Sequence, residues 1–135
     1  MSLLNIAVWG LGNHAKKRIL PALSAIDEVK LVGLCSRNSK VVDECAKQWD
    51  CTGWNDPVQM LNSSKVDVVY ISTPIGVHFS LAKQAIKAGK HVWCEKPLTC
   101  SYADTQTLVS LAKESGKVLT ESFMYLYHPQ FYRVK

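Results

Sequence analysis

Ile-Ala-Val-Trp-Gly-Leu-Gly-Asn-His-Ala, at residues 6–15, joins an apolar run to two glycines and then to a segment typical of a helix start. Its order matches the G-x-G-x-x-G/A fingerprint of dinucleotide-binding folds. Gly10 permits a tight turn from strand to helix, and Gly12 leaves space for a pyrophosphate beside the backbone. Ala15 allows the helix to lie close to the sheet, and the free N–H groups of its first turn favour phosphate. A glycine pair also suits an ordinary turn, so the surrounding pattern has to decide between the two interpretations.

The rest of the chain alternates apolar runs with helical patterns. Short runs rich in Val and Ile predict strands, and apolar residues at i, i+3 and i+4 predict helices. The expected strands lie at 4–9, 29–35, 50–55, 66–72, 91–94 and 118–122, and the expected helices begin near residues 13, 39, 57, 77 and 101. Strands that alternate with helices through short connections predict an α/β fold, a doubly wound parallel sheet with right-handed crossovers.

Several positions predict how the helices begin and bend. Pro21 lacks the N–H that would bond back to Lys17, so a kink or break is expected there. Ser39 is the expected N-cap of the second helix. Ser101, with Asp104 three residues later, has the pattern of a capping box.

Composition excludes several other classes of protein. The chain has 135 residues, which suits one domain, and its net charge of +5 comes from scattered basic residues, so no nucleic-acid partner is expected. The tightest basic group, residues 16–18, is interpreted as a solvated helix face rather than an attraction for an anionic cofactor. The absence of a long apolar stretch and of a signal peptide predicts a cytoplasmic protein without a membrane partner.

The five cysteines form no C-x-x-C pair and are odd in number, which indicates free thiols in a reducing compartment. No ligand spacing for a metal is visible, so no metal site is expected. Neither a nucleophile elbow nor a P-loop is present, which disfavours acyl transfer and nucleotide hydrolysis.

The second expected strand ends in Ser36-Arg37, where dinucleotide folds usually carry an acidic residue for the ribose 2′-hydroxyl. A hydroxyl and a guanidinium suit a 2′-phosphate instead. This favours NADP over NAD, and the alternative is a surface arginine in a turn.

Three more groups follow strands of the same predicted sheet. Ser72-Thr73-Pro74 offers a hydroxyl and a rigid turn for the ribose on the nicotinamide side. His78 opens the next helix, where a packed or solvated histidine is favoured over a catalyst. Lys96, at a strand end, can hold or move a proton during hydride transfer, and a surface salt-bridge lysine is an equally open alternative.

Five blocks of sequence stand in order along the chain: Gly10–Ala15, Ser36-Arg37, Ser72-Thr73-Pro74 with His78, Glu95-Lys96-Pro97, and Phe123-Met124 with His128-Pro129. Together they resemble the glucose–fructose oxidoreductase / inositol dehydrogenase (Gfo/Idh/MocA) family of NAD(P)-dependent oxidoreductases. The Glu-Lys-Pro block is the most specific part. The resemblance covers essentially the whole chain, and its tail looks most like the dihydrodiol and xylose dehydrogenase branch.

The resemblance implies a Rossmann cofactor domain in which Lys96 is the catalytic, proton-handling residue. It also implies a cis Lys96–Pro97 bond, and Ile75 departs from the Asn that is usual in the family. The cofactor-binding residues that it implies are Gly10, Leu11, Gly12, Asn13, His14, Ser36, Arg37, Ser72, Thr73, Pro74, His78, Glu95 and Lys96.

Family members carry a second α+β domain for a sugar-like substrate, and we expect the given residues to end where that domain begins. We therefore expect a dinucleotide-binding domain at 1–122 and, at 123–135, a crossover toward a missing C-terminal substrate domain. The expected reaction is hydride transfer between NADP(H), or NAD(H), and a sugar or polyol CH–OH group, in an enzyme that is a homo-oligomer at full length. The alternative is a short, non-catalytic nicotinamide-nucleotide-binding module that acts through a partner.

Overall fold

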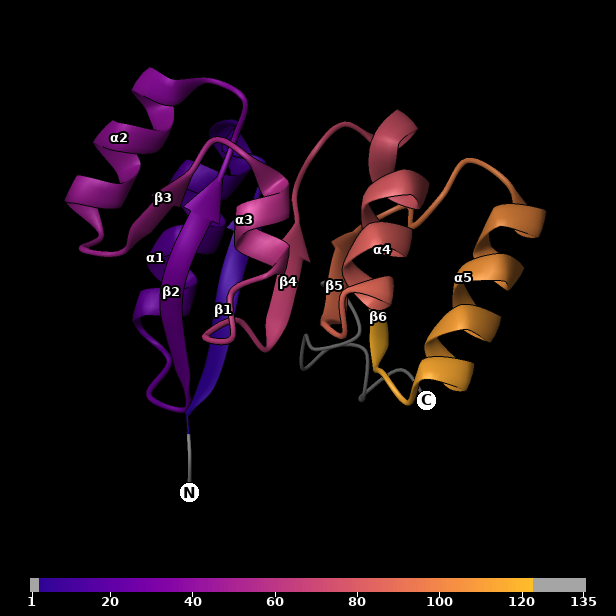
Figure 1. Cartoon of the computed structure of the whole chain (residues 1–135). Coiled ribbons are helices and arrows are strands. Elements are labelled where there is room, and N and C mark those ends of the chain that lie inside the picture. Colours follow the sequence, from indigo (N-terminus) through magenta and orange to yellow (C-terminus); the bar gives the residue numbers. More distant parts are fainter. Residues whose placement is uncertain (1–2, 123–135) are drawn as a thin grey trace, which may run out of the picture.

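A six-stranded parallel sheet organises the computed structural model, which describes residues 3–122 (Figure 1). The strand order is β3-β2-β1-β4-β5-β6, so the predicted doubly wound sheet is confirmed. The strands are β1 (Leu4–Trp9), β2 (Val29–Cys35), β3 (Thr52–Trp54), β4 (Val68–Ile71), β5 (His91–Glu95) and β6 (Leu119–Ser122). The helices are η1 (Ala15–Ile19), α1 (Leu20–Ser24), α2 (Ser39–Gln48), α3 (Pro57–Leu61), η2 (Ile75–Val77), α4 (His78–Lys87) and α5 (Tyr102–Ser115). The expected crossover at 123–135 lies outside the described residues.

Two apolar layers cover the sheet, and β1 contributes to both. Ala7 and Trp9 pack in the layer beneath α3, α4 and α5, whereas Ile6 and Val8 pack in the layer beneath α1 and α2 (Figure 1). A strand that is covered on both faces needs an apolar side chain at every position. This explains why residues 6–9 of the first strand are a continuous apolar run rather than an alternating one, whereas Asn5 lies at the partly exposed start of the strand.

The strand order reverses between β1 and β4, which lie side by side at the centre of the sheet. The backbone just beyond these strands is tied to the sheet, because the Ser72 N–H donates to the Trp9 carbonyl at 2.8 Å and the Gly10 N–H to the Cys35 carbonyl at 2.9 Å. Ligands of open α/β sheets bind outside the carboxyl ends of the strands at this reversal point. The fold therefore places the glycine-rich turn at the ligand-binding edge.

The helix after β1 is irregular, as Pro21 predicts. A π-helical turn, Ala15–Ile19, precedes the proline, and the Leu20 N–H donates to the carbonyl of Ala15, five residues back. Pro21 then occupies the first turn of α1, where its missing N–H leaves no bond unmade. The expected break is thus a locally widened turn.

The start of α2 corrects the predicted cap. The N-cap is Asn38, not Ser39, because Asn38 has the extended backbone of a cap residue and its side-chain oxygen accepts the Val41 N–H at 3.2 Å. Ser39 is already helical. The cap at Ser101 is confirmed, since its hydroxyl accepts the Asp104 N–H at 3.1 Å.

Within residues 3–122, no helix is both long enough and apolar enough to cross a membrane. The same part of the chain holds no cluster of side chains suited to a metal ion.

Candidate functional site

A cavity of about 510 Å³ lies at the carboxyl edge of the sheet, beyond β1, β2 and β4. Residues from three strand ends line it, which is the arrangement expected at the reversal point of the strand order. Eight of the predicted site residues are in its wall: Gly10, Leu11, Gly12, Ser36, Arg37, Ser72, Thr73 and Pro74.

Gly10 and Gly12 differ in the space around their Cα atoms and in their backbone conformation. Gly10 has a φ of +105°, and a Cβ there would lie 2.7 Å from the Ser72 carbonyl oxygen. A Cβ on Gly12 would meet no atom within 4 Å. Gly10 is therefore required by the fold itself, whereas Gly12 borders open space.

Backbone amides are available next to that open space. The first backbone bond of the helix is the one that the Lys16 N–H donates to the Gly12 carbonyl at 3.0 Å. In the part of the chain that the structure describes, the N–H groups of Gly12, Asn13 and His14 donate to no backbone carbonyl. Free amides at a helix start carry partial positive charge and suit a phosphate group.

The wall beyond β2 is polar and ordered. The Ser36 hydroxyl accepts the Asn38 N–H at 3.2 Å, and the Asn55 side-chain amide donates to the Ser36 carbonyl at 3.4 Å. Arg37 is exposed, and none of the described carboxylates pairs with it. A free guanidinium beside a hydroxyl can bind an anionic group at this wall.

Asn55 was missed by the sequence analysis, although it also lines the cavity. It directly follows β3, so the rule that singled out Ser36 and Ser72, a polar residue just beyond a strand end, would have found it.

A buried hydroxyl in the turn after β4 lacks a partner. Among the described residues, no group hydrogen-bonds the Thr73 Oγ1 atom, although that atom is inaccessible to solvent. Buried polar atoms almost always have a hydrogen-bond partner, so a buried hydroxyl without one needs an explanation. A ligand in the adjoining cavity provides one, and the residues present therefore fit a bound dinucleotide.

The end of β5 carries an acidic group that reaches back to the glycine-rich helix. Glu95 Oε1 lies 3.1 Å from Nε2 of His14, and the Tyr70 hydroxyl donates to the same oxygen. Tyr70 is buried, and its burial, followed by the hydrogen bond with Glu95, raises its pKa. The phenol therefore stays a neutral donor that fixes the carboxylate.

Lys96 is exposed beside this carboxylate, and the structure gives it no ion pair with the described residues. The Lys96–Pro97 bond is cis, as the resemblance implies. The predicted residues Asn13, His14, His78, Glu95 and Lys96 are not in the cavity wall.

His78 lies beneath the surface rather than on it, so the packed role favoured by the sequence analysis is the observed one. Its side chain is 1% exposed. Nε2 lies 2.8 Å from the Thr73 carbonyl oxygen, and Nδ1 lies 3.0 Å from the Pro97 carbonyl oxygen. Both polar atoms of the ring are directed at the backbone.

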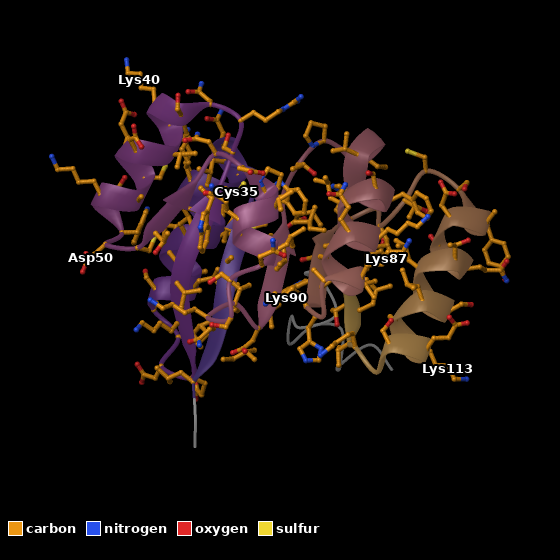
Figure 2. All side chains as sticks on the ribbon, in the orientation of Figure 1. Cys35, Lys40, Asp50, Lys87, Lys90 and Lys113 are labelled. Carbon is orange, nitrogen blue, oxygen red and sulfur yellow. The ribbon has the colours of Figure 1, made fainter. Side chains whose placement is uncertain are left out.

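Two other buried groups that titrate lie at opposite ends of the sheet (Figure 2). Cys35 lines the cavity, and burial, with a smaller effect of Asp56, raises the pKa of its thiol to about 11. Lys90 precedes β5, donates to the carbonyls of Ser63 and Val66 at 2.7 Å, and has a pKa lowered by burial. Cys35 is thus a neutral thiol in the site, and Lys90 is a structural lysine away from it.

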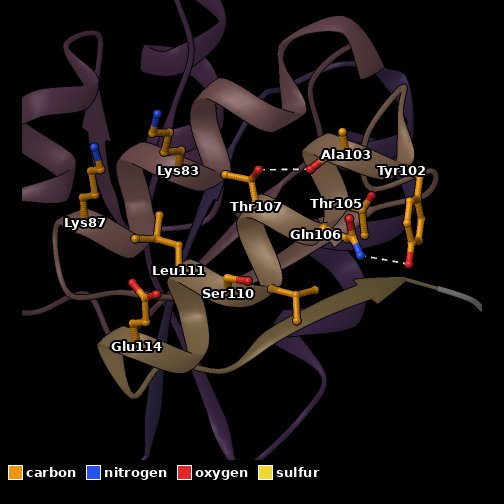
Figure 3. A pocket seen from close by; sticks show the side chains of 11 residues that line it. Lys83, Lys87, Tyr102, Ala103, Thr105, Gln106, Thr107, Ser110, Leu111 and Glu114 are labelled. Atoms are coloured by element: carbon orange, nitrogen blue, oxygen red, sulfur yellow. Dashed lines mark hydrogen bonds between the residues drawn. The ribbon is translucent and has the colours of Figure 1, made fainter.

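A larger hollow, of about 1040 Å³, lies along α4 and α5 (Figure 3). Three of its side chains already have hydrogen-bond partners. Gln106 donates to the Tyr102 hydroxyl at 2.9 Å and Thr107 to the Ala103 carbonyl at 3.0 Å, both within α5, and the Thr105 hydroxyl lies 2.7 Å from that of Thr99. None of the predicted site residues lines it. The smaller cavity at the carboxyl edge is therefore the candidate site.

The chain is similar to known proteins over most of its length. The model of the oxidoreductase family with an NAD-binding Rossmann fold matches residues 4–123. A dTDP-3,4-didehydro-2,6-dideoxy-alpha-D-glucose 3-reductase of Streptomyces violaceoruber is 36% identical over 98% of this chain and 39% of its own length. The D-xylose 1-dehydrogenase (NADP(+)) 2 of Haloferax volcanii is 32% identical over 90% of this chain and 38% of its own length.

Solved structures show the same backbone. A 3-ketoreductase from Actinomadura kijaniata in complex with NADP superposes with a TM-score of 0.95 at 32% identity, over 98% of this chain and 42% of that one. A protein of gentamicin A biosynthesis in complex with NAD gives a TM-score of 0.92 at 29% identity, over 98% of this chain and 38% of that one. The chain thus spans about 40% of the length of the relatives it matches.

Proposed function

The chain belongs to the oxidoreductase family with an NAD-binding Rossmann fold, and from this we propose that it is the cofactor-binding domain of a sugar dehydrogenase or reductase. The cofactor is NADP in preference to NAD. The observation that carries the proposal is the open space over Gly12, next to amides that have no backbone partner. Relatives whose names include NADP(+), and the solved complex with NADP, support the choice of cofactor.

We assign the phosphates of the dinucleotide to the glycine-rich turn. The amides of Gly12, Asn13 and His14 would hold the pyrophosphate, with Leu11 in the wall beside it. Gly10 keeps the turn tight enough for this approach.

The adenosine end would lie against the wall beyond β2. There the Ser36 hydroxyl and the Arg37 guanidinium would bind the ribose 2′-phosphate. No described carboxylate neutralises Arg37, which leaves its charge available for an anion.

The nicotinamide end would lie along the turn after β4, where Ser72 and Pro74 line the wall and the orphan Thr73 hydroxyl would gain a partner. The bound nicotinamide supplies a hydride donor or acceptor. Lys96 would hold or deliver the proton of the substrate hydroxyl at its Nζ atom, and Glu95 would border the same site.

The substrate would be a sugar or a related polyol, bound by a second domain outside residues 1–135. Support comes from the relatives, which are named for sugar derivatives and are about two and a half times as long. A cytoplasmic homo-oligomer completes the proposal. The five free thiols support a reducing compartment, and the exposed apolar side chains of Tyr102 and Val109 on α5 support association. Light scattering of the full-length protein tests the assembly state.

Titration of the purified chain with NADPH and NADH tests the function, followed by the fluorescence of its four tryptophans, of which Trp9 lines the cavity. We expect saturable binding of both cofactors, with NADPH at least tenfold tighter. Binding of neither would refute the proposal. Tighter binding of NADH would refute only the preference for NADP.

A further inference from the structure

The short segment that follows β5, residues 96–98, is held from two sides by side chains of other elements. Its cis peptide bond joins Lys96 to Pro97. His78 contacts the carbonyl of Pro97, and Glu121 contacts the amide of Leu98. Neither His78 nor Glu121 is in the wall of the cavity.

The imidazole of His78 connects the turns after two neighbouring strands. Its nitrogens lie 2.8 Å from the Thr73 carbonyl and 3.0 Å from the Pro97 carbonyl, one turn on each side. A ring nitrogen contacts a carbonyl oxygen favourably only when it carries a proton, so at least one of these contacts is a donated hydrogen bond. His78 is the first residue of α4, which is fixed to the sheet by buried Ala82, Ala85 and Ile86.

The carboxylate of Glu121 holds the other side of the segment. Its Oε2 atom accepts the Leu98 N–H at 2.5 Å. Glu121 lies on β6, in register with Cys94 of β5, and its charge adds to burial in raising the pKa of Cys94 to about 12. The Leu98 side chain is buried in the apolar layer, so backbone and side chain of this residue are both anchored.

Lys96 has no comparable anchor of its own. It is exposed, and no described residue forms an ion pair with it. The position of its amine relative to the turn after β4 therefore depends on the backbone on both sides: Glu95, which β5 holds in the sheet, and the segment that follows Lys96. A displacement of about 1 Å at a reacting group can lower a rate by roughly a hundredfold.

We propose that His78 and Glu121 are positioning residues for Lys96. Together they fix the backbone of residues 97 and 98 against the turn at Thr73, and so hold the lysine amine beside the nicotinamide end of the cavity. This inference rests on the proposed function, because the site that Lys96 serves is the proposed cofactor site.

The test uses acylation of Lys96 by an amine reagent, measured by peptide mass spectrometry with and without saturating NADPH. In the unaltered chain we expect bound NADPH to slow acylation of Lys96 at least fivefold. In His78→Ala and Glu121→Ala this protection should fall below twofold, and in Glu121→Ala the Kd for NADPH should change less than threefold. Lys113, in the last turn of α5, is the internal control and should show no protection.

Two conservative variants separate positioning from folding. Glu121→Gln keeps an oxygen that accepts the Leu98 N–H and should retain protection, and His78→Gln keeps one donor and should give an intermediate value. Hydrogen exchange of the Leu98 amide, measured without cofactor, should accelerate at least tenfold in Glu121→Ala and stay unchanged in Glu121→Gln.

The outcomes distinguish the two proposals. Protection that is equal in all the variants, or equal amide exchange at Leu98, would overturn the positioning role while leaving the proposed function intact. If the unaltered chain binds NADPH but leaves Lys96 unprotected, the assignment of Lys96 and that of its positioning residues both fail. If the unaltered chain binds no NADPH, the proposed function fails first and the positioning role fails with it.

Discussion

Nε2 of His14 lies 3.1 Å from Oε1 of Glu95, although 81 residues separate the two in the sequence. The contact joins the start of the glycine-rich helix to the carboxyl end of β5. It places the proposed phosphate site and Lys96 on the same edge of the sheet. A cofactor that spans this edge can therefore reach both, which proton transfer by Lys96 beside the nicotinamide requires.

A double-mutant cycle between His14→Ala and Glu95→Gln tests whether this contact persists in solution. The side chains are 43% and 16% exposed, so solvent weakens the pair and we expect a coupling energy of about 0.5 kcal/mol. Urea unfolding of the four proteins measures it. At a pH where His14 is protonated, the coupling should shrink in 0.5 M NaCl, because salt screens exposed charges. A coupling of zero at low salt would show that the contact between His14 and Glu95 does not join the glycine-rich helix to the end of β5.

Alanine at the two glycines should separate folding from binding. Gly10→Ala places a Cβ 2.7 Å from the Ser72 carbonyl oxygen at a φ of +105°, so we expect the free energy of unfolding to fall by more than about 2 kcal/mol. Gly12→Ala enters open space, so the free energy of unfolding should change by less than about 0.5 kcal/mol. Its methyl group stands where the pyrophosphate is proposed, so NADPH affinity should fall at least tenfold.

Denaturation and fluorescence titration measure these two quantities independently. The result that contradicts the proposed site is a Gly12→Ala chain that binds NADPH as tightly as the original. A Gly10→Ala chain with unchanged stability would contradict the geometry of the turn itself.

Removal of one guanidinium should change the cofactor preference. Hydrogen bonds to a charged group contribute about 1.5–3 kcal/mol, so Arg37→Ala should weaken NADPH binding by roughly 10- to 100-fold and leave NADH binding within threefold. Lys113→Ala removes the same charge from α5, distant from the cavity, and is the matched control. Equal loss of affinity for both cofactors would mean that Arg37 does not distinguish the 2′-phosphate.

The architecture could be predicted because the sequence pattern of each segment agrees with the place of that segment in the fold. The apolar run inside the expected strand at 4–9 predicted β1, whose residues 6–9 are buried between the two apolar layers. The helix expected to begin near residue 101 is α5, which Gly116 ends in the left-handed conformation, with φ +67°. Eight cavity residues were identified because strand ends of one parallel sheet must meet at one edge.

Where the structure differs from the prediction, the reason is a backbone conformation or a contact that the sequence pattern does not contain. Asn38 and Ser39 are both good cap residues, and only the extended backbone at Asn38 distinguishes them. A proline predicts a disturbed helix, but not that a π-helical turn will absorb it. The sequence favoured a packed or solvated His78, but it could not identify the two carbonyls that the ring contacts, because the two turns meet only in the folded sheet.

Alkaline pH should destabilise the chain partly through Cys94. Burial, with Glu121 and Glu95, raises the pKa of the folded thiol to about 12, whereas an unfolded thiol titrates near 8.5. Between about pH 9 and pH 12 the folded chain keeps a proton that the unfolded chain loses. The free energy of unfolding therefore falls as pH rises, by at most about 1.4 kcal/mol per pH unit for this one group.

Comparison of the unaltered chain with Cys94→Ala isolates this contribution. Other groups, including Lys90 with its lowered pKa, titrate in both proteins and cancel in the difference between them. Urea unfolding at pH 8 to 10.5, with a reductant present, should show that the variant loses stability less steeply above pH 9, even though its stability at pH 8 is lower because a buried side chain is truncated. Cys100→Ala, at an exposed thiol, should follow the unaltered chain. Parallel curves for the unaltered chain and Cys94→Ala would show that the buried thiol ionises as readily in the folded chain as in the unfolded one.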